Sequence, residues 1–85
     1  MSSVKQQETL IAWGFSLPYA QSLPNRHAKE LIQQLWRISN IYYRGNLTRL
    51  SADVREAIAR KNMGEVETAQ AIADLDRMSK VVTNG

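Results

Sequence analysis

One stretch of the sequence decides the fold: residues 25–45, which read NRHAKELIQQLWRISNIYYRG. Its apolar residues recur every three or four positions, at Ala28, Leu31, Ile32, Leu35, Ile38 and Tyr42. That spacing lays them along one face of an α-helix, and Trp36 lies beside this face and widens it. Gly45 and the asparagine after it form a helix-stop pair. The pattern therefore predicts a long central helix, from about Asn25 to Arg44, as the spine of the domain.

The segment before this spine carries the punctuation of two further helices. Ser3-Val4-Lys5-Gln6 fits a capping box, and it opens a helix that is predicted to run to Trp13. Gly14 follows where a left-handed C-terminal cap is needed. Ser16 then caps a short helix over residues 17–22, whose second residue is a proline of the kind tolerated in a first turn.

The segment after the spine is predicted to hold the remaining helices. Residues 47–50 are expected to be a connector, after which Ser51 caps a helix with Asp53 in its positive first turn. A last helix is predicted from about Glu65 to Val81. It is expected to place six apolar residues largely on one side: Val66, Ala69, Ile72, Ala73, Leu75 and Met78. Gly64 either separates these two helices or bends one long helix.

These elements predict an all-α fold, a small compact bundle of four to five helices. The 85 residues are expected to form a single domain, with residues 1–3 and 82–85 frayed. The sequence shows no alternating strand pattern, no internal repeat and no linker.

The composition argues against several functional classes. With no cysteine, the chain has no disulfide, no thiolate-bound metal and no thiol nucleophile. His27 is the only histidine, and the four glycines are isolated, so neither a multi-histidine metal site nor a phosphate-binding loop is expected. Asp74 and Asp76 are two residues apart, which points them to different sides of a helix, and both are interpreted as solvated. We therefore expect no enzymatic activity, no metal, no cofactor and no small-molecule substrate.

The N-terminal residues are polar, and no apolar run approaches the roughly 18–20 residues of a membrane span. A cytoplasmic location without membrane contact is the expectation. The net charge of +3 is distributed unevenly along the chain. Residues 1–61 hold nine basic and four acidic side chains, a balance of +5, whereas residues 62–85 hold two and four, a balance of −2. Such asymmetry is typical of a nucleic-acid face, of reciprocal pairing in a homodimer, or simply of two solvated helices.

The first hypothesis for function is DNA binding by a small transcription regulator. The short helix over residues 17–22, the break at Leu23-Pro24 and the long helix after it have a helix–turn–helix outline. The side chains expected to reach phosphates or base edges are Asn25, Arg26, His27, Lys29, Gln33, Arg37, Arg44 and Arg49. The size and basic character are typical of small bacterial, plasmid or phage regulators.

The second hypothesis is a protein-interaction module, such as a co-regulator, antirepressor or adaptor that grips a DNA-binding protein. The sequence has more large amphipathic side chains than so small a domain can bury. The expected interface comprises Trp36, Tyr42, Tyr43 and Arg44, residue types that are enriched at binding hot spots. Tyr42 and Tyr43 are consecutive, so both cannot face one core, and at least one ring is expected to meet solvent or a partner.

Overall fold

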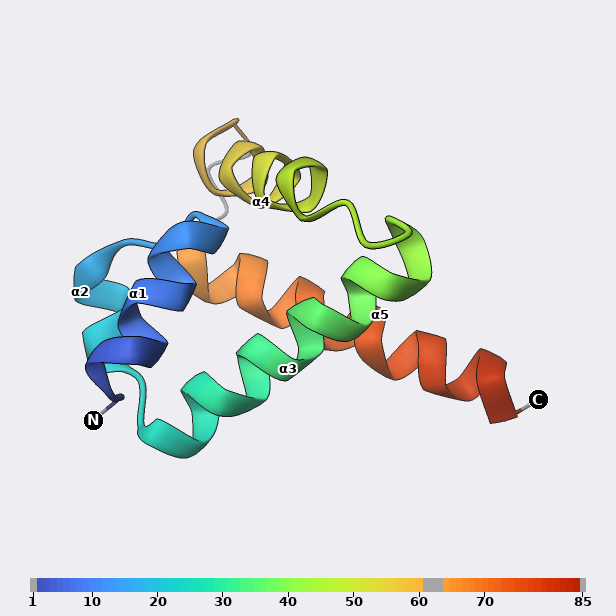
Figure 1. The fold of residues 1–85 in the computed structure, drawn as a ribbon, viewed down its shortest axis with the longest axis horizontal. Coiled ribbons are helices and arrows are strands. Elements are labelled where there is room, and N and C mark those ends of the chain that lie inside the picture. Colours follow the sequence, from blue (N-terminus) through green and yellow to red (C-terminus); the bar gives the residue numbers. More distant parts are fainter. Residues whose placement is uncertain (1, 61–63, 85) are drawn as a thin grey trace.

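The structure, a computed structural model, describes residues 2–60 and 64–84. Within these ranges the chain forms five α-helices and no strand (Figure 1). They are α1 (Val4–Trp13), α2 (Leu17–Ser22), α3 (Asn25–Tyr42), α4 (Leu47–Arg60) and α5 (Gly64–Asn84). The all-α class and the long central helix predicted from the sequence are confirmed.

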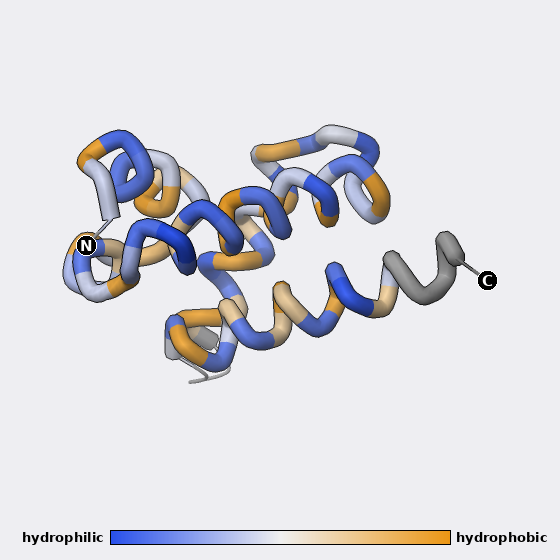
Figure 2. Tube along the Cα trace, turned by 90° about the horizontal axis from the view of Figure 1, so that it is seen from below, coloured by the Kyte–Doolittle hydropathy of each residue, from blue (hydrophilic) through white to orange (hydrophobic). Residues whose placement is uncertain are grey.

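The two longest helices, α3 and α5, pack against each other and run in the same general direction (Figure 1). Helix α1 packs on both α3 and α2, while α4 lies against α1 and α5. The C-terminal end of α5 extends beyond the other helices (Figure 1), and hydrophobic and hydrophilic residues are interspersed along the part of α5 that Figure 2 colours. The molecule measures 38 × 28 × 21 Å along its principal axes, so it is longer than it is thick.

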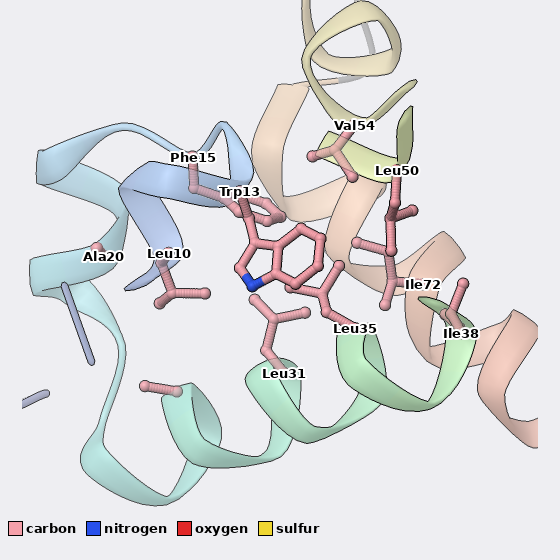
Figure 3. Close-up of a cluster of buried hydrophobic side chains, with 11 residues drawn as sticks. Leu10, Trp13, Phe15, Ala20, Leu31, Leu35, Ile38, Leu50, Val54 and Ile72 are labelled. Atoms are coloured by element: carbon pink, nitrogen blue, oxygen red, sulfur yellow. The ribbon is translucent and has the colours of Figure 1, made fainter. Parts of the chain in front are cut away.

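The core lies where α1, α3, α4 and α5 meet, as Figure 3 shows. Its buried apolar side chains are Leu10, Trp13, Phe15, Ala20, Ala28, Leu31, Leu35, Ile38, Leu50, Val54 and Ile72. Four of the six stripe residues predicted for the spine are in this set, and Ile32 is partly buried against it. Tyr42, the last residue of the stripe, is instead 48% exposed because α3 ends there.

The N-terminal helix begins and ends as the sequence predicts. Ser3 closes a capping box, and Gly14 adopts the left-handed conformation with φ of 118°. A Cβ atom at Gly14 would also lie 2.6 Å from Cγ of Arg55, so both backbone conformation and packing require glycine. The Ser2 hydroxyl donates a hydrogen bond of 2.6 Å to the carbonyl of Ala20. Ser2 and Ser3, which were expected to be frayed, are therefore held by hydrogen bonds.

The end of α3 differs from the prediction by two residues. The helix stops at Tyr42 rather than Arg44. Arg44 has φ of 52° and Gly45 has φ of 81°, so both lie in the left-handed region, where the chain leaves the helix axis. The backbone N–H of Gly45 donates to the carbonyl of Ser39 at 2.9 Å, which satisfies one of the last carbonyls of the helix.

The prediction for the start of α4 is wrong. Residues 47–50 form the first turn of the helix rather than a connector, because Asn46 is the residue that caps it. The Asn46 side-chain oxygen accepts a hydrogen bond of 3.1 Å from the backbone N–H of Arg49. Ser51 therefore lies inside the helix, where its hydroxyl donates back to a carbonyl one turn earlier. Asp53 is consequently not in the first turn.

Helix α5 is separate from α4 and follows a different direction, which answers the question left open at Gly64 (Figure 1). Gly64 has φ of 76° and is the first residue of α5, which continues past the predicted end to Asn84. Over residues 64–79, its buried side chains are mostly polar and comprise Thr68, Ile72, Asp76 and Ser79. Val66 and Met78 are exposed by 70% and 59%. The prediction of one apolar side was therefore wrong, because at about 100° per residue these side chains spread over more than half of the helix circumference.

Candidate nucleic-acid interface

Four of the predicted DNA-contacting side chains lie together on α3. Arg26, Lys29, Gln33 and Arg37 follow one another at spacings of three and four residues and line one open hollow with Glu30, Gln34 and Asp76. The buried residues of α3 lie on the opposite side of the helix. Arg26, Lys29 and Gln33 are all exposed, and Arg37 is partly buried. We refer to these four residues as the outer face of α3.

Arg37 differs from the rest of the outer face because it is bound within the protein. Its guanidinium donates two hydrogen bonds to the Asp76 carboxylate, from Nε at 2.7 Å and from Nη2 at 2.8 Å. The Asp76 side chain is 4% exposed and that of Arg37 is 41% exposed, so the pair sits at the edge of the α3–α5 contact. The hydrogen bond to Asp76 is the main cause that raises the pKa of Arg37 above its ordinary value.

This ion pair corrects the interpretation of the two aspartates of α5. Asp76 is buried and links α5 to α3, so it is not a solvated surface residue. Asp74 is exposed, as expected, and it accepts a hydrogen bond of 3.0 Å from Arg77 on the same helix. The sequence held no sign of this difference, because Arg37 is 39 residues away from its partner.

The N-terminus of α3 is the other notable feature of this surface. Pro24 occupies the N-cap position, and within the described residues no side chain caps the helix. The first turn also contains no acidic residue. Backbone N–H groups at such an end can donate to an anion, and the helix dipole favours negative charge there. Asn25 and Arg26 are exposed beside this end of the helix.

The remaining predicted DNA contacts are elsewhere. His27 lies on another side of α3 and lines a hollow with Tyr19, Leu23 and residues of α5. Arg44 and Arg49 are exposed at the opposite end of α3, beyond about 24 Å of helix measured from Arg26. The eight predicted residues are therefore not all on one surface. Four form the outer face of α3 and Asn25 lies at its end, whereas His27 is on another side of the helix and Arg44 and Arg49 are at its far end.

The aromatic set is likewise divided between two places. Trp36 is 45% exposed and lies edge-on to Trp13, with ring centroids 5.8 Å apart. It lines a hollow between α1 and α4, whereas Tyr42 and Tyr43 line another that includes Leu75 of α5. The prediction that at least one of the two tyrosines meets solvent is confirmed by Tyr42.

Tyr43 is a structural link between two helices. Its hydroxyl donates a hydrogen bond of 2.5 Å to the Asp53 carboxylate of α4. Burial raises the pKa of Tyr43 to about 12, and the hydrogen bond to Asp53 adds to the effect. Tyr43 therefore joins the end of α3 to α4, and its side chain is less available to a partner than that of Tyr42.

Two further polar side chains, Glu65 and Arg55, form hydrogen bonds that hold distant segments of the chain together. Glu65 at the start of α5 accepts hydrogen bonds from the backbone N–H and the hydroxyl of Ser16, each at 2.8 Å at its shortest. Arg55 of α4 donates a hydrogen bond of 2.9 Å to the carbonyl of Ala12, close to the end of α1. Both contacts join segments more than 40 residues apart, so no local pattern could have indicated them.

The chain matches none of the family models with which it was compared, and neither the curated proteins nor the solved structures gave a match. In the described part of the chain, no three acidic or histidine side chains gather as they do around a metal ion. None of the described helices combines the length and the apolar character needed to cross a membrane. The functional proposal therefore depends on the geometry of the surface.

Proposed function

We propose that this protein is a cytoplasmic, DNA-binding regulator of transcription that inserts the outer face of α3 into the major groove. The observation that carries the proposal is the row of Arg26, Lys29 and Gln33, three exposed side chains on one side of a long helix. An α-helix with its side chains is about 10–12 Å wide, and the major groove of B-DNA is about 12 Å wide. Arginine and lysine suit phosphates and guanine, and glutamine suits adenine.

The surroundings of α3 support this orientation. Helix α2 and the Leu23-Pro24 turn precede α3, which is the order of elements in a helix–turn–helix. The N-terminus of α3, which lacks a side-chain cap, can accept a DNA phosphate on its backbone N–H groups. We assign Arg37 a supporting role, because its guanidinium is already bound to Asp76.

Titration of duplex DNA tests the proposal through its dependence on salt. Neutralised phosphates release counterions, so log K falls linearly with log salt, with a slope of about −0.9 for each phosphate contact. We expect the Arg26→Ala, Lys29→Ala double variant to bind more weakly and to lose about 1.8 from this slope. Fluorescence anisotropy with labelled random-sequence duplexes at several salt concentrations measures both quantities.

Lys5→Ala supplies the matched control, because Lys5 is an exposed cation that belongs to α1 and not to the outer face of α3. We expect it to keep the affinity and slope of the unmodified protein. The proposal fails if the unmodified protein binds no duplex at low ionic strength, or if Lys5→Ala reduces the slope as much as the α3 variant does.

A second candidate function is docking to another protein through Trp36. The observation that favours it is that Trp36 is 45% exposed beside Leu47, which is 38% exposed, at the rim of an apolar hollow that also includes Trp13. Exposed tryptophan beside such a hollow is typical of hot spots in protein interfaces.

Affinity capture from the source cell, with and without nuclease, separates the two candidates. DNA binding predicts recovery of nucleic acid that is lost in the Arg26→Glu, Lys29→Glu variant. Protein docking predicts one stoichiometric partner that survives nuclease treatment and is lost with Trp36→Ala.

A further inference from the structure

A group of exposed apolar side chains lies where α3 ends beside α5. Tyr42 and Leu75 line the same hollow and are 48% and 40% exposed. Met78 is 59% exposed and follows Leu75 by three residues, so it lies on the same side of α5. Single exposed apolar residues are normal on a monomer, but adjoining large ones on two helices are characteristic of interaction surfaces. We refer to Tyr42, Leu75 and Met78 as the apolar face.

The two edges of the apolar face carry opposite charge. On one edge, Arg49 of α4 lines the hollow beside Tyr42, and Arg44 is exposed at the end of α3. Asp53 lines the same hollow and contributes one negative charge to this edge. On the far side of Met78, α5 presents Glu67 and Asp74, which are seven residues apart and so share one side of the helix.

Asp74 is bound to Arg77, but both side chains remain more than half exposed. The edge formed by α4 and the end of α3 therefore has a net charge of +1, from Arg44, Arg49 and Asp53. The edge formed by α5 has a net charge of −1, from Glu67, Asp74 and Arg77.

We propose that the apolar face binds a second copy of this chain across a two-fold axis. In an isologous contact each copy presents the same patch, so the positive edge of one copy meets the negative edge of the other. Met78 lies near the axis, and Arg49 of each copy faces Asp74 of its partner. An apolar centre flanked by edges of opposite sign is the arrangement that makes a surface complementary to itself.

The amount of exposed surface supports a partner of this size. The chain has 5707 Å² of accessible surface, whereas a compact monomer of its 9.6 kDa mass exposes about 5,100 Å². The excess, on the order of 600 Å², approaches the roughly 800 Å² that each partner buries in an interface of standard size.

Dimerisation through the apolar face is compatible with DNA binding but does not depend on it. On α3, Tyr42 lies on nearly the opposite side from Arg26, Lys29 and Gln33, given 3.6 residues per turn. Pairing therefore leaves the outer face of α3 open in both copies.

Sedimentation equilibrium of the full chain over a range of concentrations tests the interface. We expect the unmodified protein to approach twice the 9.6 kDa mass of the chain, and Met78→Glu to raise the dissociation constant at least tenfold. Two glutamates would then face each other near the axis. Val66→Glu is the matched control, because Val66 is 70% exposed on another side of the same helix, and we expect it to leave the dimer intact.

A charge exchange tests the edges without altering the apolar centre. We expect Arg49→Asp and Asp74→Arg each to weaken the dimer several-fold, and the double variant to recover most of the loss because opposite charges again face each other. Circular dichroism shows whether each variant keeps its helical content.

The proposal is overturned if the unmodified chain remains a monomer at about 1 mM, the weak limit of specific association. It is equally overturned if a dimer forms but Met78→Glu and Val66→Glu affect it alike, or if the charge exchange gives no recovery. Any of these results leaves the DNA titrations unaffected, so failure of the dimer is distinguishable from failure of DNA binding.

Discussion

Helices α3 and α5 are the two longest in the protein and pack against each other, but different forces set their orientations. Helix α3 buries the apolar stripe that its sequence displays, with Leu31, Leu35 and Ile38 all at most 5% exposed. Over the residues whose burial is described, 64–79, helix α5 buries one large apolar residue, Ile72, among Thr68, Asp76 and Ser79. The burial of α3 is thus hydrophobic, whereas the rotation of α5 about its axis is fixed in large part by polar contacts.

This difference between α3 and α5 shows when the spacing of apolar residues predicts which side of a helix is buried. Where apolar residues cluster on one side, area removed from water selects a single orientation, at about 25 cal/mol per Å². Where they are spread around the helix, several orientations bury similar areas, and a specific contact decides between them. In α5 that contact is the Asp76 carboxylate with Arg37 of α3.

The largest expected effect comes from truncating one leucine on each helix. Leu35→Ala in α3 removes a side chain that is 0% exposed and leaves a cavity, so we expect a loss of about 3 kcal/mol in the free energy of unfolding. Leu75→Ala in α5, at a residue 40% exposed, is expected to cost less than about 1 kcal/mol. Urea unfolding followed by circular dichroism, at a concentration where the chain is monomeric, measures both. Equal losses of unfolding free energy in the two variants would contradict the conclusion that α3 is held mainly by apolar burial and α5 is not.

The second effect concerns the ion pair that orients α5. Arg37→Ala removes the guanidinium that donates two hydrogen bonds to the buried Asp76 carboxylate, and we expect a loss of about 2 kcal/mol. Asp76→Ala is expected to cost about 1 kcal/mol, because the released Arg37 side chain is 41% exposed and can be hydrated. A double-mutant cycle should give a coupling on the order of 1 kcal/mol. A coupling near zero would show that other contacts set the rotation of α5.

The same contrast explains which features could be predicted from the sequence. The caps at Ser3, Gly14 and Ser16 depend only on neighbouring residues, and all three are present in the structure. The start of α4 was mispredicted because Asn46 and Ser51 are both good N-cap residues, and local pattern does not rank them.

The candidate site follows the same rule. The row of Arg26, Lys29 and Gln33 could be predicted because it is a matter of spacing on a single helix. The binding of Arg37 and the apolar face could not be predicted, because both require the packing of α3 on α5. Nothing in the sequence distinguishes Asp74 from Asp76 before that packing is known.

The ends of the two helices allow a third test. The end of α3 is joined to α4 by Tyr43 and Asp53, whereas the end of α5 extends away from the other helices (Figure 1). Because the pKa of Tyr43 is raised to about 12, the folded protein keeps the phenol proton at a pH where the unfolded chain has lost it. This contribution to stability is therefore complete below about pH 10 and is lost as the pH rises toward 12.

Tyr43→Phe is expected to reduce the alkaline loss of stability by on the order of 1–2 kcal/mol, after allowance for solvent screening at this partly buried side chain. Denaturant unfolding at pH 9, 10 and 11 measures it, with Tyr42→Phe as the matched control at the neighbouring residue. A variant that loses stability with pH as steeply as the unmodified protein would show that the Tyr43–Asp53 contact does not hold the corner.

The smallest expected effect compares one buried serine on each helix. Ser39 of α3 is fully buried, and its hydroxyl has no hydrogen-bond partner among the described residues. Ser79 of α5 is 5% exposed, and its hydroxyl donates a hydrogen bond of 2.7 Å to the carbonyl of Asp76. Replacement by alanine improves helix propensity equally at both positions. At Ser39 it also relieves the desolvation of an unpaired hydroxyl, whereas at Ser79 it removes a hydrogen bond.

We therefore expect Ser39→Ala to stabilise the protein by up to about 1 kcal/mol and Ser79→Ala to be neutral or slightly destabilising. Urea unfolding of the two variants in parallel is sufficient, since the difference between them cancels the shared gain in propensity. The result bears on what holds each helix. A stabilised Ser39→Ala would show that the unpaired Ser39 hydroxyl destabilises the buried side of α3. The apolar residues around Ser39 would then be what fixes the orientation of the helix. A destabilised Ser39→Ala would mean that its hydroxyl is satisfied in solution, so that polar contacts help to orient α3 as they do α5.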